Sequence, residues 1–130
     1  MTEPDPGMLA LATRIAQFIA GADGLDGVFA RDVTIIENFA PHIFRGVATW
    51  RDAMRHHTQA LSNLSFAFAP AVDFSVHDDC AYFCVPVTWT GKLHGKPFRE
   101  LGGKSIVLRQ EDGAWRVAAY AWAVVEMRFI

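Results

Sequence analysis

One stretch near the C-terminus restricts the possible folds of this chain more than any other. Residues 117–125 read Val-Ala-Ala-Tyr-Ala-Trp-Ala-Val-Val, without a charged side chain. This run is about half as long as the roughly 20 apolar residues that a membrane helix needs, so it does not predict a membrane span. A strand without alternating polar residues must instead be covered on both of its faces. The chain therefore has to supply partners for both sides of its last strand.

Composition and charge exclude several classes of protein. Hydrophobic residues make up 52% of the 130 residues and charged residues 20%, so the chain can bury enough apolar surface to offset its ordering entropy and is not disordered. Its 12 basic and 14 acidic residues form no run of either sign, which argues against a nucleic-acid-binding surface. The first residues lack the basic flank and apolar segment of a secretory signal, so we expect a cytoplasmic protein.

The two cysteines predict neither a disulfide nor a metal site. Cys80 and Cys84 lie four residues apart in a predicted strand, a span of about 13 Å, whereas a disulfide needs Cα atoms roughly 4.4–6.8 Å apart. We expect two free, buried thiols. No Cys and His spacing matches a structural zinc site, so we expect no metal and no cofactor.

The apolar periodicity changes from helical to alternating along the chain. The first half predicts three helices, over residues 8–22, 25–30 and 46–61, and two short strands, over 33–37 and 43–45. The second half predicts four long strands, over 64–76, 80–91, 98–110 and 115–127. This order is typical of an α+β fold, with a flexible N-terminus over 1–7 and a single domain over 8–130.

Two interruptions in the strand patterns predict a strongly bent sheet. Pro70 lies in the middle of the first long strand, and proline within a strand indicates an edge or a bulge. Gly102 and Gly103 interrupt the third long strand, where they would permit a bulge or a sharp bend. We expect a mainly antiparallel sheet that curves around the three N-terminal helices.

The order of these elements resembles a known superfamily. Residues 25–37 are similar to a helix-to-strand passage, Arg45-Gly46 precedes a helix with an aromatic residue at its start, and residues 110–117 are similar to a final hairpin. Together these segments, which span residues 8–125, resemble the NTF2-like superfamily and its SnoaL-like and ketosteroid-isomerase-like members. The resemblance implies a cone-shaped fold with an apolar pocket at its open end.

Two residues are candidates for catalysis in such a pocket. Ketosteroid isomerases carry their catalytic Asp base at the position that matches Glu37, and the apolar neighbours Ile35, Ile36 and Phe39 would raise its pKa. Alternatively, Glu37 is a solvated residue at a strand end. His57 lies on the apolar face of the helix over 46–61, as an acid, a base or a ligand-binding group. Its alternative role is that of a core histidine bonded to a backbone carbonyl.

The predicted ligand-binding residues line the same pocket. Trp89 is favoured over Tyr82, because residues seven apart on a strand face opposite sides. The chain departs from the isomerases in two places: Ala16 lies near the position of their oxyanion-hole Tyr, and residues 104–106 contain no carboxylate. Lys104 would contact an anionic or carbonyl ligand or, as we expect, lie on a solvated strand face. The predicted ligand-binding set is Phe18, Phe39, His42, Trp50, Met54 and Trp89.

The uncharged run over 117–125 predicts a homodimer through the sheet. With a regular period of two, Val117, Ala119, Ala121 and Ala123 would face the pocket. The opposite face, with Tyr120, Trp122 and Val124, would then pack against a second subunit.

The sequence thus predicts a protein that binds a small hydrophobic molecule. As an enzyme it would be a cofactor-independent isomerase, cyclase or dehydratase that uses acid–base chemistry on a carbonyl-type substrate. The alternative is a non-catalytic ligand-binding domain, or a dimerisation or assembly domain, of the same fold.

Overall fold

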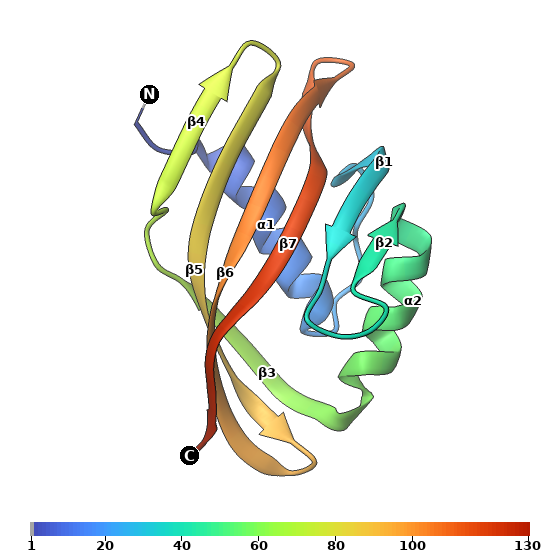
Figure 1. Ribbon diagram of the computed structural model, residues 1–130, viewed down its shortest axis with the longest axis vertical. Coiled ribbons are helices and arrows are strands. Elements are labelled where there is room, and N and C mark those ends of the chain that lie inside the picture. The colour runs from blue at the N-terminus through green and yellow to red at the C-terminus, as the bar shows by residue number, and fades with distance from the viewer. Residues whose placement is uncertain (1) are drawn as a thin grey trace.

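In the computed structural model, which describes residues 2–130, a seven-stranded sheet curves strongly around two helices (Figure 1). The elements in chain order are α1 (Pro6–Ile19), β1 (Phe29–Ile36), β2 (Ile43–Arg45), α2 (Val47–His57), a 3-10 turn (Thr58–Ala60), β3 (Leu61–Phe68), β4 (Asp73–His77), β5 (Cys80–Leu93), β6 (Lys96–Glu111) and β7 (Ala114–Phe129). The strands follow the order β2-β1-β7-β6-β5-β3, with β4 also paired to β5. All pairs are antiparallel except β1 with β7, so the mainly antiparallel α+β fold is confirmed.

The prediction of three helices is wrong, because the described residues contain two α-helices. Within the segment predicted as the second helix, residues 26–28 form a turn and β1 begins at Phe29. Gly24 and Gly27 adopt positive φ angles, of 103° and 76°. Left-handed residues cannot continue a right-handed helix. The helix predicted over 46–61 also ends early, at His57, and Leu61 already belongs to β3.

Helix α1 covers the inner face of the sheet. Asp5 caps it by accepting a hydrogen bond from the backbone N–H of Met8 at 2.8 Å, and Pro6 occupies its first turn. The segment predicted to be flexible, 1–7, therefore overlaps the start of this helix; Met1 lies outside the described residues. The apolar stripe of α1, which includes Leu11 and Ile15, is buried in the main core. Within residues 2–130, neither helix combines the length and the apolar character needed to cross a membrane.

The first predicted long strand is divided at Pro70. Strand β3 ends at Phe68 and β4 begins at Asp73, and both pair with β5 along different parts of its length. The proline, which has no N–H to donate, lies between them, so the prediction of one continuous strand over 64–76 is wrong, whereas an edge position agrees with the pairing of β3 and β4 to β5 alone. The two cysteines on β5 are free, as expected, but neither is buried: Cys80 is exposed and Cys84 is half-buried.

Val117 is buried as predicted, but beyond it the two faces of β7 are exchanged relative to the prediction. Tyr120 and Trp122 are buried, with 2% and 9% of their surface exposed, and line the inside of the curved sheet. The cause is a bulge: Val107 pairs with Ala119, but its neighbour Leu108 pairs with Val117, so β7 contains one extra residue. The extra residue shifts the inward–outward alternation by one. The prediction that Tyr120 and Trp122 pack against a second subunit is therefore wrong.

A second bulge bends the sheet at Gly102, as the glycine pair predicted. Leu101 pairs with Glu126 and Gly102 with Val124, which leaves one residue of β7 without a partner position. A Cβ atom on Gly102 would overlap the carbonyl oxygen of Ala123 and the indole of Trp122. Glycine is therefore required where β6 and β7 approach each other most closely.

The two adjacent glycines provide a matched test of this bend. We expect Gly102→Ala to lower the free energy of unfolding by about 3 kcal/mol, because the backbone of β7 must move to admit the methyl group. Gly103→Ala should change it by less than about 1 kcal/mol, since its Cβ would meet only the Cys84 sulfur at 3.7 Å. Chemical denaturation measures both; equal losses would contradict the assignment.

Candidate functional site

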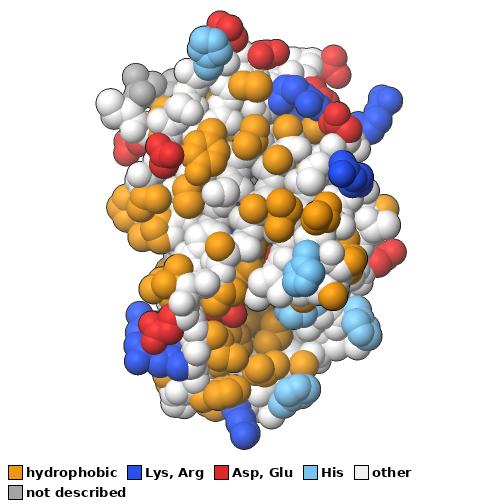
Figure 2. Space-filling view, viewed as in Figure 1, with side chains coloured by type: hydrophobic (Ala, Val, Ile, Leu, Met, Phe, Trp, Pro, Cys, Tyr) orange, Lys and Arg blue, Asp and Glu red, His pale blue; other side chains and the backbone are white. Residues whose placement is uncertain are grey.

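A cavity of about 240 Å³ lies inside the curved sheet, below the C-terminal end of α2. Figure 2 shows the molecule hollowed at this place, with hydrophobic side chains inside the opening. Its apolar walls are formed by Ile19, Phe39, Met54, Leu61, Leu64, Trp89, Leu93, Phe98, Trp122 and Met127. Its polar lining residues are Glu37, Asn38, His57, Thr58, Glu100, Lys104 and Tyr120.

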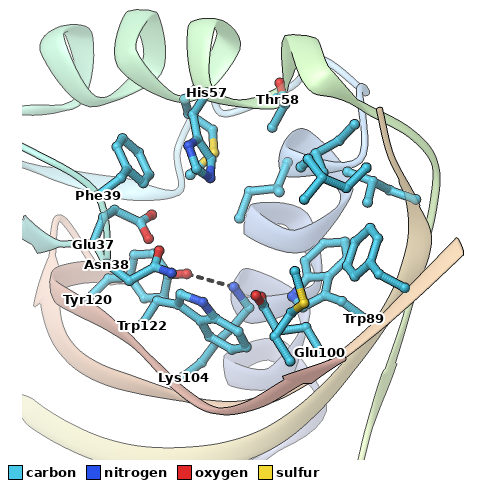
Figure 3. Close-up of a pocket in the computed structure, with 17 residues that line it drawn as sticks. Glu37, Asn38, Phe39, His57, Thr58, Trp89, Glu100, Lys104, Tyr120 and Trp122 are labelled. Carbon is cyan, nitrogen blue, oxygen red and sulfur yellow. Dashed lines mark hydrogen bonds between the residues drawn. The ribbon is translucent and has the colours of Figure 1, made fainter. Parts of the chain in front are cut away.

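Glu37 follows the last residue of β1 and is buried, with 3% of its surface exposed. Its Oε2 atom accepts a hydrogen bond from the Trp50 indole at 2.8 Å. Figure 3 shows the carboxylate directed into the cavity, where Oε1 has no hydrogen-bond partner among residues 2–130. Burial raises the pKa of Glu37, while the Trp50 hydrogen bond and the charge of Lys104 act in the opposite direction. The group is thus anchored at one oxygen and open to a ligand at the other.

Trp50 fixes the position of the Glu37 carboxylate from outside the cavity. It lies on α2 with none of its surface exposed. Its ring packs against those of Phe18, Phe29 and Tyr120, with centroids 5.3, 5.5 and 6.4 Å away. Trp50 does not line the cavity. It affects the cavity through the Glu37 carboxylate, to which it donates a hydrogen bond.

Lys104 is fully buried, and the expectation that it lies on a solvated face is wrong. It occupies an inward position of β6, two residues before the equally buried Ile106. Its ammonium nitrogen, Nζ, donates a hydrogen bond to the Tyr120 hydroxyl at 2.7 Å. The same atom lies 4.7, 5.3 and 5.9 Å from the ring centroids of Tyr120, Trp122 and Trp89.

Burial changes the acid–base character of this pair. It lowers the pKa of Lys104 to about 8, against the opposing effect of the Glu37 charge. It also raises the pKa of Tyr120, and the negative charge of Glu37 adds to that shift. At neutral pH the tyrosine is therefore a hydroxyl, and a measurable fraction of Lys104 is a neutral amine.

Glu100 is a polar lining residue that our sequence reasoning missed. It lies on β6, four residues before Lys104, and even spacing on a strand places both on one face. The four-residue spacing of Glu100 and Lys104 could therefore have indicated, from the sequence, that both side chains face the same side of the strand. Burial raises the pKa of Glu100 as well.

His57 lines the cavity at the end of α2, where it is exposed to solvent rather than being a core histidine. Its ring stacks on that of Phe39, with centroids 4.1 Å apart and planes at 9°. Burial lowers the pKa of His57, and the charge of the neighbouring His56 lowers it further. The imidazole is therefore neutral at neutral pH. A neutral imidazole has one donor and one acceptor nitrogen, which suits an acid, a base or a binding group.

The predicted ligand-binding residues fall into two groups, and the binding role of each stays a prediction. Phe39, Met54 and Trp89 line the cavity. Phe18, His42 and Trp50 do not: Phe18 is buried beneath the Arg55 guanidinium, 4.0 Å from its ring centroid, and His42 is exposed in the loop after Glu37. Within residues 2–130, no group of three or more His, Cys, Asp or Glu side chains is placed to hold a metal ion.

The Trp50 hydrogen bond can be tested without a substrate. We expect Trp50→Phe to raise the pKa of Glu37 further, because the variant keeps a buried ring but removes the donor that stabilises the carboxylate. A carbon-13 NMR titration of the glutamate carboxyl groups, assigned with Glu37→Gln, measures the shift. Trp115→Phe, which changes a tryptophan outside the cavity lining, should leave this pKa unchanged. An unaltered titration in Trp50→Phe would contradict the assigned role.

Comparison with known proteins gives matches at the level of structure. No protein-family model and no curated protein matches the sequence. A hexachlorocyclohexane dehydrochlorinase superposes with a TM-score of 0.84 at 10% identity, covering 95% of this chain and 86% of that chain. A putative scytalone dehydratase from Novosphingobium aromaticivorans gives 0.77 at 11% identity, with coverages of 95% and 85%. An NTF2-like superfamily protein from Salmonella enterica serovar Typhimurium gives 0.74 at 16% identity, with coverages of 88% and 86%. The chain therefore has the fold of the NTF2-like superfamily, which its sequence resembles.

Proposed function

We propose that the protein is an enzyme that performs cofactor-independent acid–base chemistry on a small, largely apolar carbonyl compound. The observation that carries the proposal is the open Oε1 atom of a buried Glu37, in an apolar cavity that also contains the buried Lys104–Tyr120 pair. A carboxylate with a raised pKa is a stronger base than a solvated one, and is suited to removing a proton next to a carbonyl group.

Different residues of the cavity would contact different parts of the substrate. The apolar walls would hold the hydrocarbon portion of the substrate, while the Lys104–Tyr120 pair would face the carbonyl oxygen. Glu37 would take the adjacent proton, and the two donors would stabilise the negative charge that develops on oxygen. Return of the proton to another carbon gives an isomerisation, and loss of a leaving group gives an elimination. His57, at the cavity opening, would assist as a neutral acid or binding group.

Structural neighbours support this reaction class without defining it. Their names include a dehydrochlorinase and a putative scytalone dehydratase. An elimination reaction can start with the removal of a proton by a base. The alternative is a non-catalytic ligand-binding domain, for which the apolar walls would suffice and the charge state of Glu37 would have no consequence.

Proton removal can be measured directly with cyclohexanone as a probe. In deuterated water, we expect the protein to accelerate deuterium incorporation at the carbons beside the carbonyl group, followed by NMR. Glu37→Gln should lower this acceleration by about 100-fold or more, because the amide cannot accept the proton. The rate should rise with pH through the pKa of Glu37, above the 4.5 of an ordinary glutamate.

Glu100→Gln is the matched control, since Glu100 also lines the cavity with a raised pKa. It should retain most of the exchange rate. Exchange lost in Glu100→Gln but kept in Glu37→Gln would transfer the role of base to Glu100. Exchange that is equal in both variants and in the wild type would favour the non-catalytic alternative.

We also propose a homodimer, formed through the outer face of the sheet. Strand register places uncharged residues side by side across four strands: Thr34, Ile36, Tyr82, Cys84, Pro86, Gly103, Ser105, Val107, Ala119, Ala121 and Ala123. In Figure 2 the middle of this face carries mostly hydrophobic and uncharged side chains. A sheet face without charges is suited to packing against a second copy of itself.

Ala121 lies in the middle of this uncharged face, beside Ile36 and Ser105. We expect Ala121→Arg to convert the dimer to a monomer, because two arginines would be brought together in an apolar interface. Sedimentation velocity measures the mass. Ala10→Arg, the same change at an exposed position of α1, should remain dimeric. A wild-type monomer at micromolar concentration would contradict the proposal.

A further inference from the structure

The amine of Lys104 is unusual among the lysines of this chain. The two others, Lys92 and Lys96, are exposed near the turn between β5 and β6. Lys104 has no exposed surface, yet it lines the cavity. None of the ion pairs within residues 2–130 includes it. A buried ammonium without a carboxylate in direct contact is costly, so the site favours an amine that can release its proton.

The surroundings of Nζ suit a nucleophile more than a structural charge. Its hydrogen-bond partner is the Tyr120 hydroxyl, which can both donate and accept. Three aromatic rings surround the nitrogen and limit its hydration. In Figure 3 the amine points into the space between Glu37 and Trp89. An amine desolvated in an apolar pocket is the usual arrangement for a lysine that bonds to a carbonyl carbon.

We propose that Lys104 binds an aldehyde or ketone covalently, as an imine, within the cavity. This inference deepens the proposed function, on which it rests for the identity of the base. It narrows the ligand class to carbonyl compounds that an amine can attack, which excludes carboxylic acids and unactivated amides. It also gives Tyr120 a reactive role as the group that moves protons to and from the nitrogen and oxygen.

The steps balance without an oxidant or a reductant. The lone pair of neutral Nζ attacks the carbonyl carbon, the carbon–oxygen π electrons move to oxygen, and a proton passes from nitrogen to that oxygen through Tyr120. The resulting carbinolamine accepts a second proton from protonated Glu37 and loses water, which leaves an iminium ion. The ionised Glu37 then removes a proton from the adjacent carbon to give an enamine. Reprotonation and hydrolysis by water return the free lysine and the carbonyl product.

Reductive trapping tests the covalent step. The full-length protein is incubated near neutral pH with cyclohexanone or acetophenone and sodium cyanoborohydride, which reduces an imine to a stable secondary amine. Digestion and mass spectrometry then locate the adduct. We expect modification at residue 104 to exceed that at Lys92 and Lys96 by about tenfold or more, because a buried neutral amine reacts where exposed ammonium groups do not. These two lysines are internal controls, so the wild-type protein alone gives a decisive result.

Two substitutions of Lys104 distinguish its role as a nucleophile from the effect of its positive charge. Lys104→Arg keeps a cation but cannot form an imine, and Lys104→Met keeps the approximate length without either property. Both should lose the adduct, while Lys96→Arg should retain it at residue 104. A correctly folded Lys104→Arg variant with unchanged deuterium exchange would show that proton removal does not pass through an imine, and would overturn the proposal.

The two readouts distinguish failure of this inference from failure of the proposed function. Deuterium exchange that depends on Glu37, without preferential trapping at residue 104 for either probe, overturns the covalent step and leaves the acid–base function intact. An adduct at residue 104 without exchange supports the covalent ligand and overturns Glu37 as the catalytic base. Modification spread equally over the three lysines overturns the assignment of Lys104.

Discussion

Two opposite charges removed from water in one cavity govern the rest of the site. Glu37 and Lys104 are both buried; Glu37 directly follows β1, and Lys104 lies on β6. The charge of each favours ionisation of the other, while burial opposes ionisation of both. Trp50 and Tyr120 supply the hydrogen bonds that each would otherwise obtain from water. Loss of any member therefore leaves a buried polar group without compensation, which is more costly than loss of an exposed ion pair.

Two bulges in β7 shape the surroundings of these charges. The bulge near Val117 reverses the strand faces, so that Tyr120 and Trp122 turn inward, and the bulge at Gly102 bends the paired strands beyond them. Without the first, alanines would line the cavity and the aromatic rings around Lys104 would lie on the outside. The aromatic surroundings of the lysine thus depend on one extra residue in a ladder of hydrogen bonds.

The sequence predicted those features that follow from local pattern. The alternating strands, the bend at Gly102 and Gly103 and the position of Glu37 after a β-branched strand all follow from neighbouring residues. The faces of β7 could not be predicted in this way, because a bulge arises from pairing with β6 and leaves no mark on β7 itself. The burial of Lys104 was missed for a related reason: a single charged residue in a strand usually faces water, and only tertiary packing reverses that preference.

The cavity lining is divided between the middle and the margins of the sheet. Glu37, Lys104 and Tyr120 lie directly after β1, on β6 and on β7, in the middle of the sheet, whereas Leu61, Leu64, Leu93 and Met127 lie on the edge strand β3 or toward strand ends. Side chains at these margins can change size without disturbing the central hydrogen bonds. The shape of the cavity and its central polar groups can therefore change independently of each other. Related chains could diverge in the molecules they accept while retaining one chemistry, and a directed-evolution library could be confined to the marginal positions.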